Sequence, residues 1–220
     1  MNAPKIPLPE YALPLPDSAR QALARAWLWL GLISLIGSGV FSVLLVLSRT
    51  PVLQELFPVA DFFHVALVAH VDLSVLVWFI AIAGMLWSLN SSSHAMGWGW
   101  LALWVCALGV ALMSLAPFIG GGVPIMANYI PVLSDPVFIS GLLVFGAGFA
   151  ALVLRSLVLA PVLGLGFNGG GALRFGLNAA AVSAAVAILA FAWSYAVVPL
   201  SLDHKAYYEI LFWGGGHALQ

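Results

Sequence analysis

Charged residues are scarce in this sequence. Only 7% of its 220 residues are Asp, Glu, Lys or Arg, whereas 63% are hydrophobic. Soluble domains carry about 25% charged and about 45–50% apolar residues, so the chain lacks the polar surface that a soluble globule needs. Seven basic and eight acidic residues give a net charge of -1, which provides no field of one sign for nucleic acid. The composition indicates an integral membrane protein in a lipid bilayer, with no nucleic-acid partner.

Cysteine is almost absent as well. Cys106 is the single cysteine and lies within an apolar run, which excludes an internal disulfide, a covalent CxxCH haem site and a cysteine-paired metal centre. The first 25 residues contain five prolines before position 17 and no short apolar core followed by a cleavage site. We therefore expect residues 1–25 to form a cytoplasmic proline-rich tail and not a signal peptide.

Long apolar runs fill the rest of the chain. They cover about 26–48, 63–88, 98–119, 137–160 and 174–200, and a sixth begins near 207 and reaches Gln220. Each complete run is long enough to cross the bilayer as a helix. The sequence predicts an all-α transmembrane helical bundle over 26–220, with about five complete spans plus the start of a sixth, joined by turns or short loops.

The basic residues predict the orientation of the bundle. With the N-terminus inside, five of them fall on inner segments and two on outer ones, which the positive-inside rule favours. The inner set is Lys5, Arg20, Arg25, Arg155 and Arg174, and the outer set is Arg49 and Lys205.

Ionisable residues inside apolar runs are costly in lipid and usually face a cofactor, a cavity or a partner. In this topology the second run enters from the outer side near Phe62 and the sixth near Ala206, which puts His70 and His217 about 12 to 17 Å below the outer surface. Two imidazoles at one depth on different helices suit a haem or a metal centre. The plain alternative is that each imidazole hydrogen-bonds a neighbouring helix.

The other ionisable residues carry weaker signals. Asp72, also in the second run, points away from His70 on a helix and either bonds a neighbouring helix or lines a proton or water path. His64 is expected at the membrane interface, and His94 and His204 are expected in solvated loops.

Three segments resemble catalytic subunit I of the haem-copper oxygen reductases, nearest to their B-type branch. Residues 208–217, YEILFWGGGH, resemble the helix-six signature YQHLFWFFGH. Residues 67–79, LVAHVDLSVLVWF, resemble the helix-two segment with the outer axial haem ligand. Residues 128–141, NYIPVLSDPVFISG, are similar to the stretch that begins the fourth helix. The resemblance implies that His70 is an axial ligand of the low-spin haem and that His217 is a catalytic residue and a ligand of the active-site copper.

The resemblance also implies what this chain does not supply. In the family, later helices carry the remaining copper and haem histidines, and no histidine follows His217. One imidazole completes neither a bis-histidine haem nor a copper site. We therefore expect 26–220 to be the first half of such a subunit, which shares its second haem and its copper with a second half or a partner chain and is inactive without it. A cytochrome c or a copper-bearing subunit would donate electrons for O2 reduction with proton uptake at a bacterial cytoplasmic membrane.

Three alternatives stay open. Family oxidases continue after the copper histidine with Pro and Glu, then Val and Tyr, whereas this chain has Ala218, Leu219 and Gln220, so a nitric oxide reductase of the same superfamily is one alternative. A membrane electron-transfer protein, with one b-type haem between His70 and His217, is another. The third is a non-catalytic scaffold in which both histidines make only interhelical hydrogen bonds.

Overall fold

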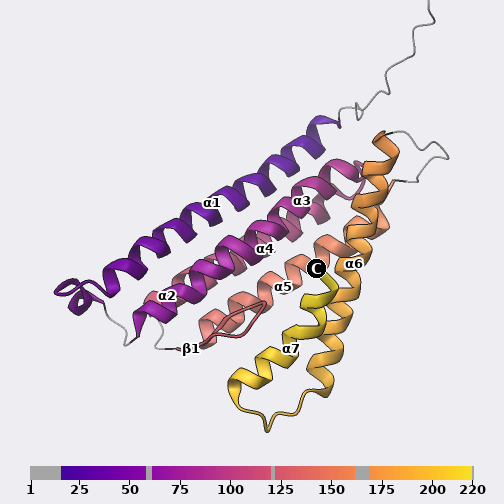
Figure 1. Ribbon diagram of the computed structural model, residues 1–220. Helices are drawn as coiled ribbons and strands as arrows, with labels where there is room; N and C mark the ends of the chain where they lie inside the picture. The colour runs from indigo at the N-terminus through magenta and orange to yellow at the C-terminus, as the bar shows by residue number, and fades with distance from the viewer. Residues whose placement is uncertain (1–15, 58–60, 120–121, 162–168, 220) are drawn as a thin grey trace, which may run out of the picture.

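The computed structural model describes residues 16–57, 61–119, 122–161 and 169–219. They form a bundle of helices with one small hairpin of two strands (Figure 1). Within these ranges five helices are long and apolar enough to cross a membrane, which confirms the predicted all-α bundle and makes the chain a multi-pass membrane protein. The elements are α1 (Ser18–Ser48), η1 (Leu53–Leu56), α2 (Phe62–Val71), η2 (Asp72–Val77), α3 (Trp78–Asn90), α4 (Met96–Ile119), β1 (Val123–Ile125), β2 (Val132–Ser134), α5 (Pro136–Val158), α6 (Gly169–Val197) and α7 (His204–Leu219).

Helix α1 begins at Ser18, well before the apolar run that starts at Ala26. Asp17 caps it, because a carboxylate oxygen accepts the backbone N–H of Arg20 at 3.0 Å and so satisfies a donor that the first turn leaves open. Residues 18–25 of the predicted tail are therefore helical, and residues 1–15 lie outside the described residues. The cytoplasmic tail over 1–25 stays a prediction.

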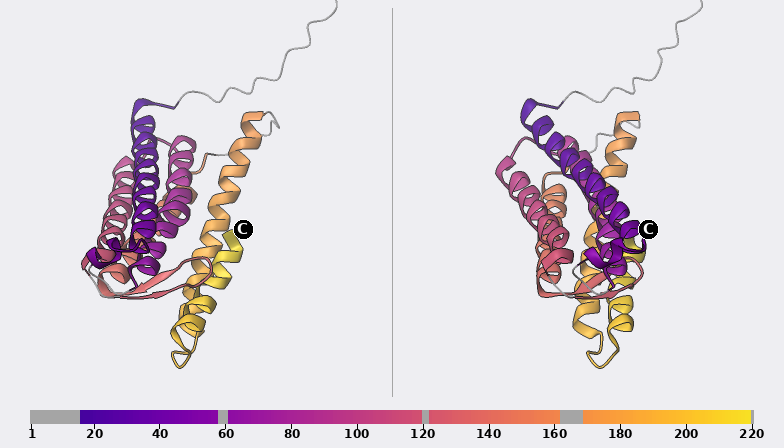
Figure 2. Two further views of the ribbon diagram at one scale, coloured as in Figure 1. Left: turned by 60° about the vertical axis from the view of Figure 1, so that its left-hand side comes forward. Right: turned by 90° about the vertical axis from the view of Figure 1, so that its left-hand side faces the viewer.

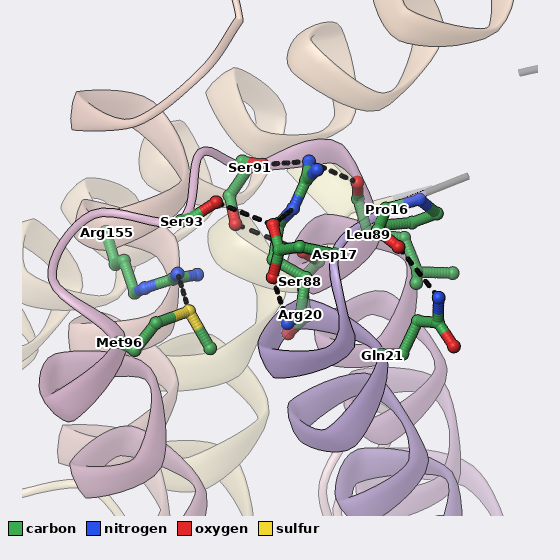
Figure 3. Close-up of polar contacts among 10 residues, drawn as sticks. All are labelled: Pro16, Asp17, Arg20, Gln21, Ser88, Leu89, Ser91, Ser93, Met96 and Arg155. Atoms are coloured by element: carbon green, nitrogen blue, oxygen red, sulfur yellow. Dashed lines mark hydrogen bonds and ion pairs between the residues drawn. The ribbon is translucent and has the colours of Figure 1, made fainter. Parts of the chain in front are cut away.

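A polar cluster surrounds this start of α1 (Figure 3). Asp17 accepts hydrogen bonds from the side chains of Arg20 and Ser93, both at 2.6 Å. The Ser93 hydroxyl, the Arg20 backbone N–H and the Arg20 guanidinium hold the pKa of Asp17 well below its usual 3.8. Arg20 also donates to the Ser91 carbonyl at 2.8 Å. The cluster ties the start of α1 to the turn between α3 and α4, beside the buried Arg155 of α5.

Helices α4 and α5 make the most extensive helix–helix contact in the described chain. Glycines allow it, because a Cβ at Gly109 would lie 2.6 Å from the Phe145 backbone nitrogen, and a Cβ at Gly148 would lie 2.7 Å from that of Cys106. Small residues let membrane helices approach at backbone distance. Cys106 is fully buried in this seam.

The second span, Phe62–Asn90, is continuous but not uniformly α-helical. Its middle turn, η2, is a π-helix between α2 and α3. Helix α1 packs against all three parts. The sequence predicts the span but not the wider turn.

The segment between α4 and α5 holds a β-hairpin, where only a loop is predicted. Val123, Pro124 and Ile125 pair with Ser134, Leu133 and Val132 in antiparallel register. Both strands pack against α2, and β2 also packs against α5.

Helices α6 and α7 form an antiparallel pair whose turn reaches past the hairpin (Figure 2). Trp87 Nε1 of α3 donates to the Leu177 carbonyl of α6 at 3.0 Å, and Asn90 bonds Asn178 at 2.8 Å. Helix α7 begins at His204 because the Asp203 carboxylate accepts two N–H groups of its first turn. His204 is thus the exposed first residue of a helix and does not lie in the predicted loop.

Candidate functional site

His70 lies half-buried on α2 and contacts Ser38 of α1. Its Nδ1 is 2.9 Å from the Ser38 carbonyl oxygen and 2.9 Å from Ser38 Oγ. Ser38 Oγ lies 3.0 Å from the His70 carbonyl, to which it donates. One assignment satisfies these contacts: the hydroxyl donates to the His70 carbonyl, and Nδ1–H donates to the Ser38 carbonyl. The neutral imidazole then carries its proton on Nδ1, which leaves Nε2 with its lone pair.

The π-helical turn η2 follows His70 at once, and single π-turns in helices are frequent at functional sites. The His70 carbonyl accepts Ser74 Oγ at 2.7 Å in addition to Ser38 Oγ. Two hydroxyl groups therefore hold the His70 backbone at the point where the helix widens.

Asp72 begins this π-turn and is 1% exposed. Neither carboxylate oxygen has a hydrogen-bond partner in the described ranges. The predicted bond to a neighbouring helix is therefore not seen there, and the proton or water path stays a prediction. An unpaired buried carboxylate is costly as an ion.

His217 lies exposed on α7, where two aromatic side chains contact it. The Tyr129 hydroxyl is hydrogen-bonded to His217 Nδ1, and the two rings meet edge to face with centroids 5.5 Å apart. Trp213, one turn earlier, has its ring centroid 4.4 Å from that of His217.

The same hairpin tip makes a second contact with α7. The backbone N–H of Asn128 donates to Glu209 Oε1 at 3.2 Å, and its side-chain amide donates to Oε2 at 2.7 Å. Two segments far apart in the sequence therefore meet: Asn128 and Tyr129 of the hairpin tip contact Glu209 and His217 of α7.

The glycines before His217 have a visible steric role. A Cβ at Gly216 would overlap the Tyr129 ring, and a Cβ at Gly215 would overlap the ring of Phe191 on α6. At Gly214 an added Cβ would meet only ordinary contacts, the nearest at 3.7 Å. The room that this sequence leaves with glycine is occupied by Tyr129 and Phe191.

The hairpin lies between the two histidine-bearing helices, because its strands pack against α2 and its tip contacts α7. The predicted common depth of His70 and His217 stays a prediction. No group of three His, Cys, Asp or Glu residues comes together within the described ranges, so a metal at His217 would take further ligands from outside them.

The remaining histidines lie apart from these contacts. His64 is partly exposed in the first turn of α2 and bonds the Asp61 carboxylate at 2.7 Å, and His94 is exposed between α3 and α4. Sequence reasoning did not identify Ser38, nor the pairing of the loop segment with α7. Residues 128–141 were singled out in the sequence, although not as a neighbour of α7. Nothing in the sequence signals Ser38.

Comparisons with known proteins give relatives without an assigned activity. No protein-family model matches the chain, and no solved structure matches it. Uncharacterized protein RP382 of Rickettsia prowazekii (strain Madrid E) is 30% identical over an alignment 234 residues long, which covers 92% of this chain and 44% of that protein. An uncharacterized protein of Aquifex aeolicus (strain VF5) is 30% identical over 194 residues, covering 88% of this chain and 48% of that protein. The chain thus spans about half the length of these relatives.

Proposed function

We propose that this chain is the N-terminal portion of the membrane-embedded catalytic subunit of a respiratory haem-copper reductase that reduces O2. In this proposal His70 is an axial ligand of a low-spin haem, and His217 is a ligand of the active-site copper. The second haem and the remaining copper ligands belong to the other half of the subunit or to a partner chain.

The observation that carries the proposal is the contact between His70 and Ser38. Histidines that bind metals almost always donate their second ring N–H to a carbonyl or carboxylate, which fixes the tautomer and the ring orientation. His70 does this, with Nδ1 2.9 Å from the Ser38 carbonyl oxygen. With Nδ1 engaged in this way, Nε2 is the ring nitrogen that would bind the haem iron.

The support for His217 is less direct. Its ring is held between Tyr129 and Trp213, at the contact between two of the three segments on which the resemblance rests. The two relatives are about twice as long as the part that this chain matches. They therefore have room for further helices of the kind that the proposal requires.

A bound haem would supply one-electron redox chemistry, and the residues around His70 would adjust it. By accepting Nδ1–H, the Ser38 carbonyl would make Nε2 a stronger donor to a haem iron, and a stronger donor would lower the reduction potential. Buried side chains of α1 and α2, among them Phe41 and Val68, would limit the access of water. An electron-donor cytochrome c or a copper-bearing subunit would deliver electrons from outside.

The proposed orientation places the N-terminus in the cytoplasm. The end of the bundle shown in Figure 3 carries Arg20 and the buried Arg155, and Arg174 lies in the first turns of α6. Basic residues concentrate on the cytoplasmic side of multi-pass membrane proteins, which supports α1 entering from inside. The membrane that we propose is the bacterial inner membrane.

The test is to tag the chain in its own membrane, solubilise the assembly gently and record reduced-minus-oxidised spectra with haem and copper content. His70→Ala should abolish the low-spin haem band, and His217→Ala should lower the copper content while that band stays. His94→Ala, a surface histidine, is the matched control. Unchanged spectra and copper content in both variants would refute the proposal.

The same preparation separates the alternatives. One haem per chain, lost in either histidine variant and accompanied by no copper, would replace the proposal with a b-type electron-transfer protein. Consumption of nitric oxide in place of O2 would change the substrate but not the roles of the two histidines.

A further inference from the structure

We propose that Tyr129 is a positioning residue for His217, because its hydroxyl fixes the orientation of the imidazole before any metal binds. The inference rests on the proposed function only for what His217 ligates. The contact itself belongs to this chain and is testable without a metal.

The backbone at Tyr129 is held in an unfavourable conformation. Its φ angle is 63°, in the left-handed region that residues with a Cβ seldom occupy. Such a conformation persists only where its surroundings determine it. Here the hairpin does so, because Ile125 and Val132 pair across it and the Ile130 N–H donates to the Asn128 carbonyl at 2.7 Å.

The tip is also fixed against α7 by two bonds. The Asn128 backbone N–H and side-chain amide occupy the two carboxylate oxygens of Glu209, at 3.2 and 2.7 Å. A pair of parallel bonds restricts rotation in a way that one bond does not. Tyr129 therefore extends toward α7 from a tip that is already anchored there.

The helix opposite leaves space for the ring. Gly216 precedes His217, and any Cβ at this position would overlap the Tyr129 ring. The missing side chain lets the hydroxyl reach Nδ1 of the next residue. The glycine and the tyrosine thus form one steric unit.

The restriction matters because the imidazole of His217 is exposed. An exposed side chain ordinarily exchanges between rotamers and loses that freedom when it binds a ligand. Tyr129 and Trp213 restrict the ring before binding, so metal binding would cost less ordering. Tyr129 touches the ligand residue and not the substrate, which makes it a positioning residue.

The experiment measures the acylation of individual histidines by diethyl pyrocarbonate. The full chain in detergent, without added metal, is treated at one pH, and each histidine-containing peptide is quantified by mass spectrometry. In Tyr129→Phe, the acylation rate of His217 should change by about threefold to tenfold, the factor that one net hydrogen bond supplies. His64 and His94 should keep their rates, and Tyr195→Phe, at an exposed tyrosine of α6, should change none of the three.

A second variant tests the steric half of the inference. Gly216→Ala keeps the hydroxyl but displaces the Tyr129 ring, so the acylation rate of His217 should change in the same direction as in Tyr129→Phe and by a similar factor. If the rate at His217 stays within twofold of the unmodified chain in both variants, Tyr129 does not position the ring. A faster acylation rate at all three histidines would show that the variant has lost its fold. In that case Asn128→Ala, which removes the side-chain bond from the hairpin tip to Glu209, would be judged by the same twofold limit at His217.

This outcome is independent of the haem proposal. If His217 responds to Tyr129→Phe but no copper is found in the native assembly, the positioning contact stands and the proposed ligand role falls. If copper is present and His217 does not respond, the ligand role stands without Tyr129.

Discussion

Two helix pairs in this molecule use glycine in opposite ways. Of the most apolar 18-residue stretch of each helix, 44% is buried in α4 and 39% in α5, but only 17% in α6. In the first pair the glycines bring backbone against backbone, as Gly148 does beside Cys106. In the second pair the glycines of α7 make room for the aromatic rings of Tyr129 and Phe191.

In the α4–α5 pair glycine serves helix packing, whereas in the α6–α7 pair it serves the candidate site around His217. The contact surface between α4 and α5 is buried by these two helices themselves, as the fully buried Cys106 shows. The α6–α7 pair leaves most of α6 exposed, and His217 of α7 contacts Tyr129 of the hairpin and Trp213 of its own helix. Under the proposed function, the exposed side of this pair is where further helices would add the remaining ligands.

The largest effect should come from filling the complete seam. Gly148→Leu would force α4 and α5 apart, because its side chain would meet the Cys106 backbone, and we expect a loss of about 3 kcal/mol in the free energy of unfolding. Thiol labelling of Cys106 during thermal unfolding in detergent reports it directly. Gly146→Leu on the same helix, where an added Cβ meets open space, is the control and should behave as the unmodified chain. Equal midpoints for the two variants would remove the distinction between the helix pairs.

A smaller effect is expected in the α6–α7 pair. Gly215→Ala would press a methyl group against the Phe191 ring, which can shift toward the open side of α6, so we expect a loss of about 1 kcal/mol. Gly214→Ala, with only ordinary contacts at the added Cβ, should be neutral or slightly stabilising. The unfolding midpoint of each variant in detergent checks this. The comparison fails if Gly215→Ala costs as much as Gly148→Leu.

Two serines of α1 contrast a hydrogen bond within a helix with one between helices. Ser34 Oγ donates to the Gly31 carbonyl of its own helix, whereas Ser38 Oγ donates across to the His70 carbonyl. Ser38→Ala should cost about 1 kcal/mol, since it leaves a tertiary bond unmade, and Ser34→Ala should cost less. Equal losses of stability in the two variants, read from their unfolding midpoints in detergent, would contradict a specific role for the Ser38 hydroxyl.

The smallest effect is a dependence on pH at the opposite end of the bundle. The pKa of Asp17 is lowered in the folded chain, so its contribution is fully present above its unfolded value of 3.8 and is lost as the pH falls below it. Asp17→Asn should therefore lower the unfolding midpoint slightly at pH 6, and the difference should shrink as the pH approaches 3. Midpoints measured at both pH values test this, and a difference that grows toward low pH would contradict it.

The sequence predicts the spans well because apolar runs of this length leave few alternatives in a bilayer. The start of α1 at Ser18 was missed because a capping aspartate and helix-forming polar residues extend a helix beyond its apolar part. The hairpin was missed because its strands are only three residues long each, and the glycines before β1 and the prolines at 124 and 131 are typical of a loop.

Only part of the site could be predicted from the sequence. Ionisable residues within apolar runs are few, which is why His70 and His217 stand out. Their partners could not be found in this way, because Ser38 lies on another helix and Tyr129 reaches α7 only through the fold of the hairpin. The glycine-rich stretch before His217 signals close approach, but not that aromatic rings make it.

The most direct test of the central claim replaces the proposed ligand with a different one. His70→Met in the native assembly should retain a low-spin haem, because a thioether also coordinates iron, while its reduction potential rises. Spectroelectrochemical titration of that haem, compared with His94→Met, measures both properties at once. A haem with an altered spectrum and a raised potential in His70→Met alone is the result that the account predicts. An unchanged spectrum and an unchanged potential would show that His70 is not a haem ligand.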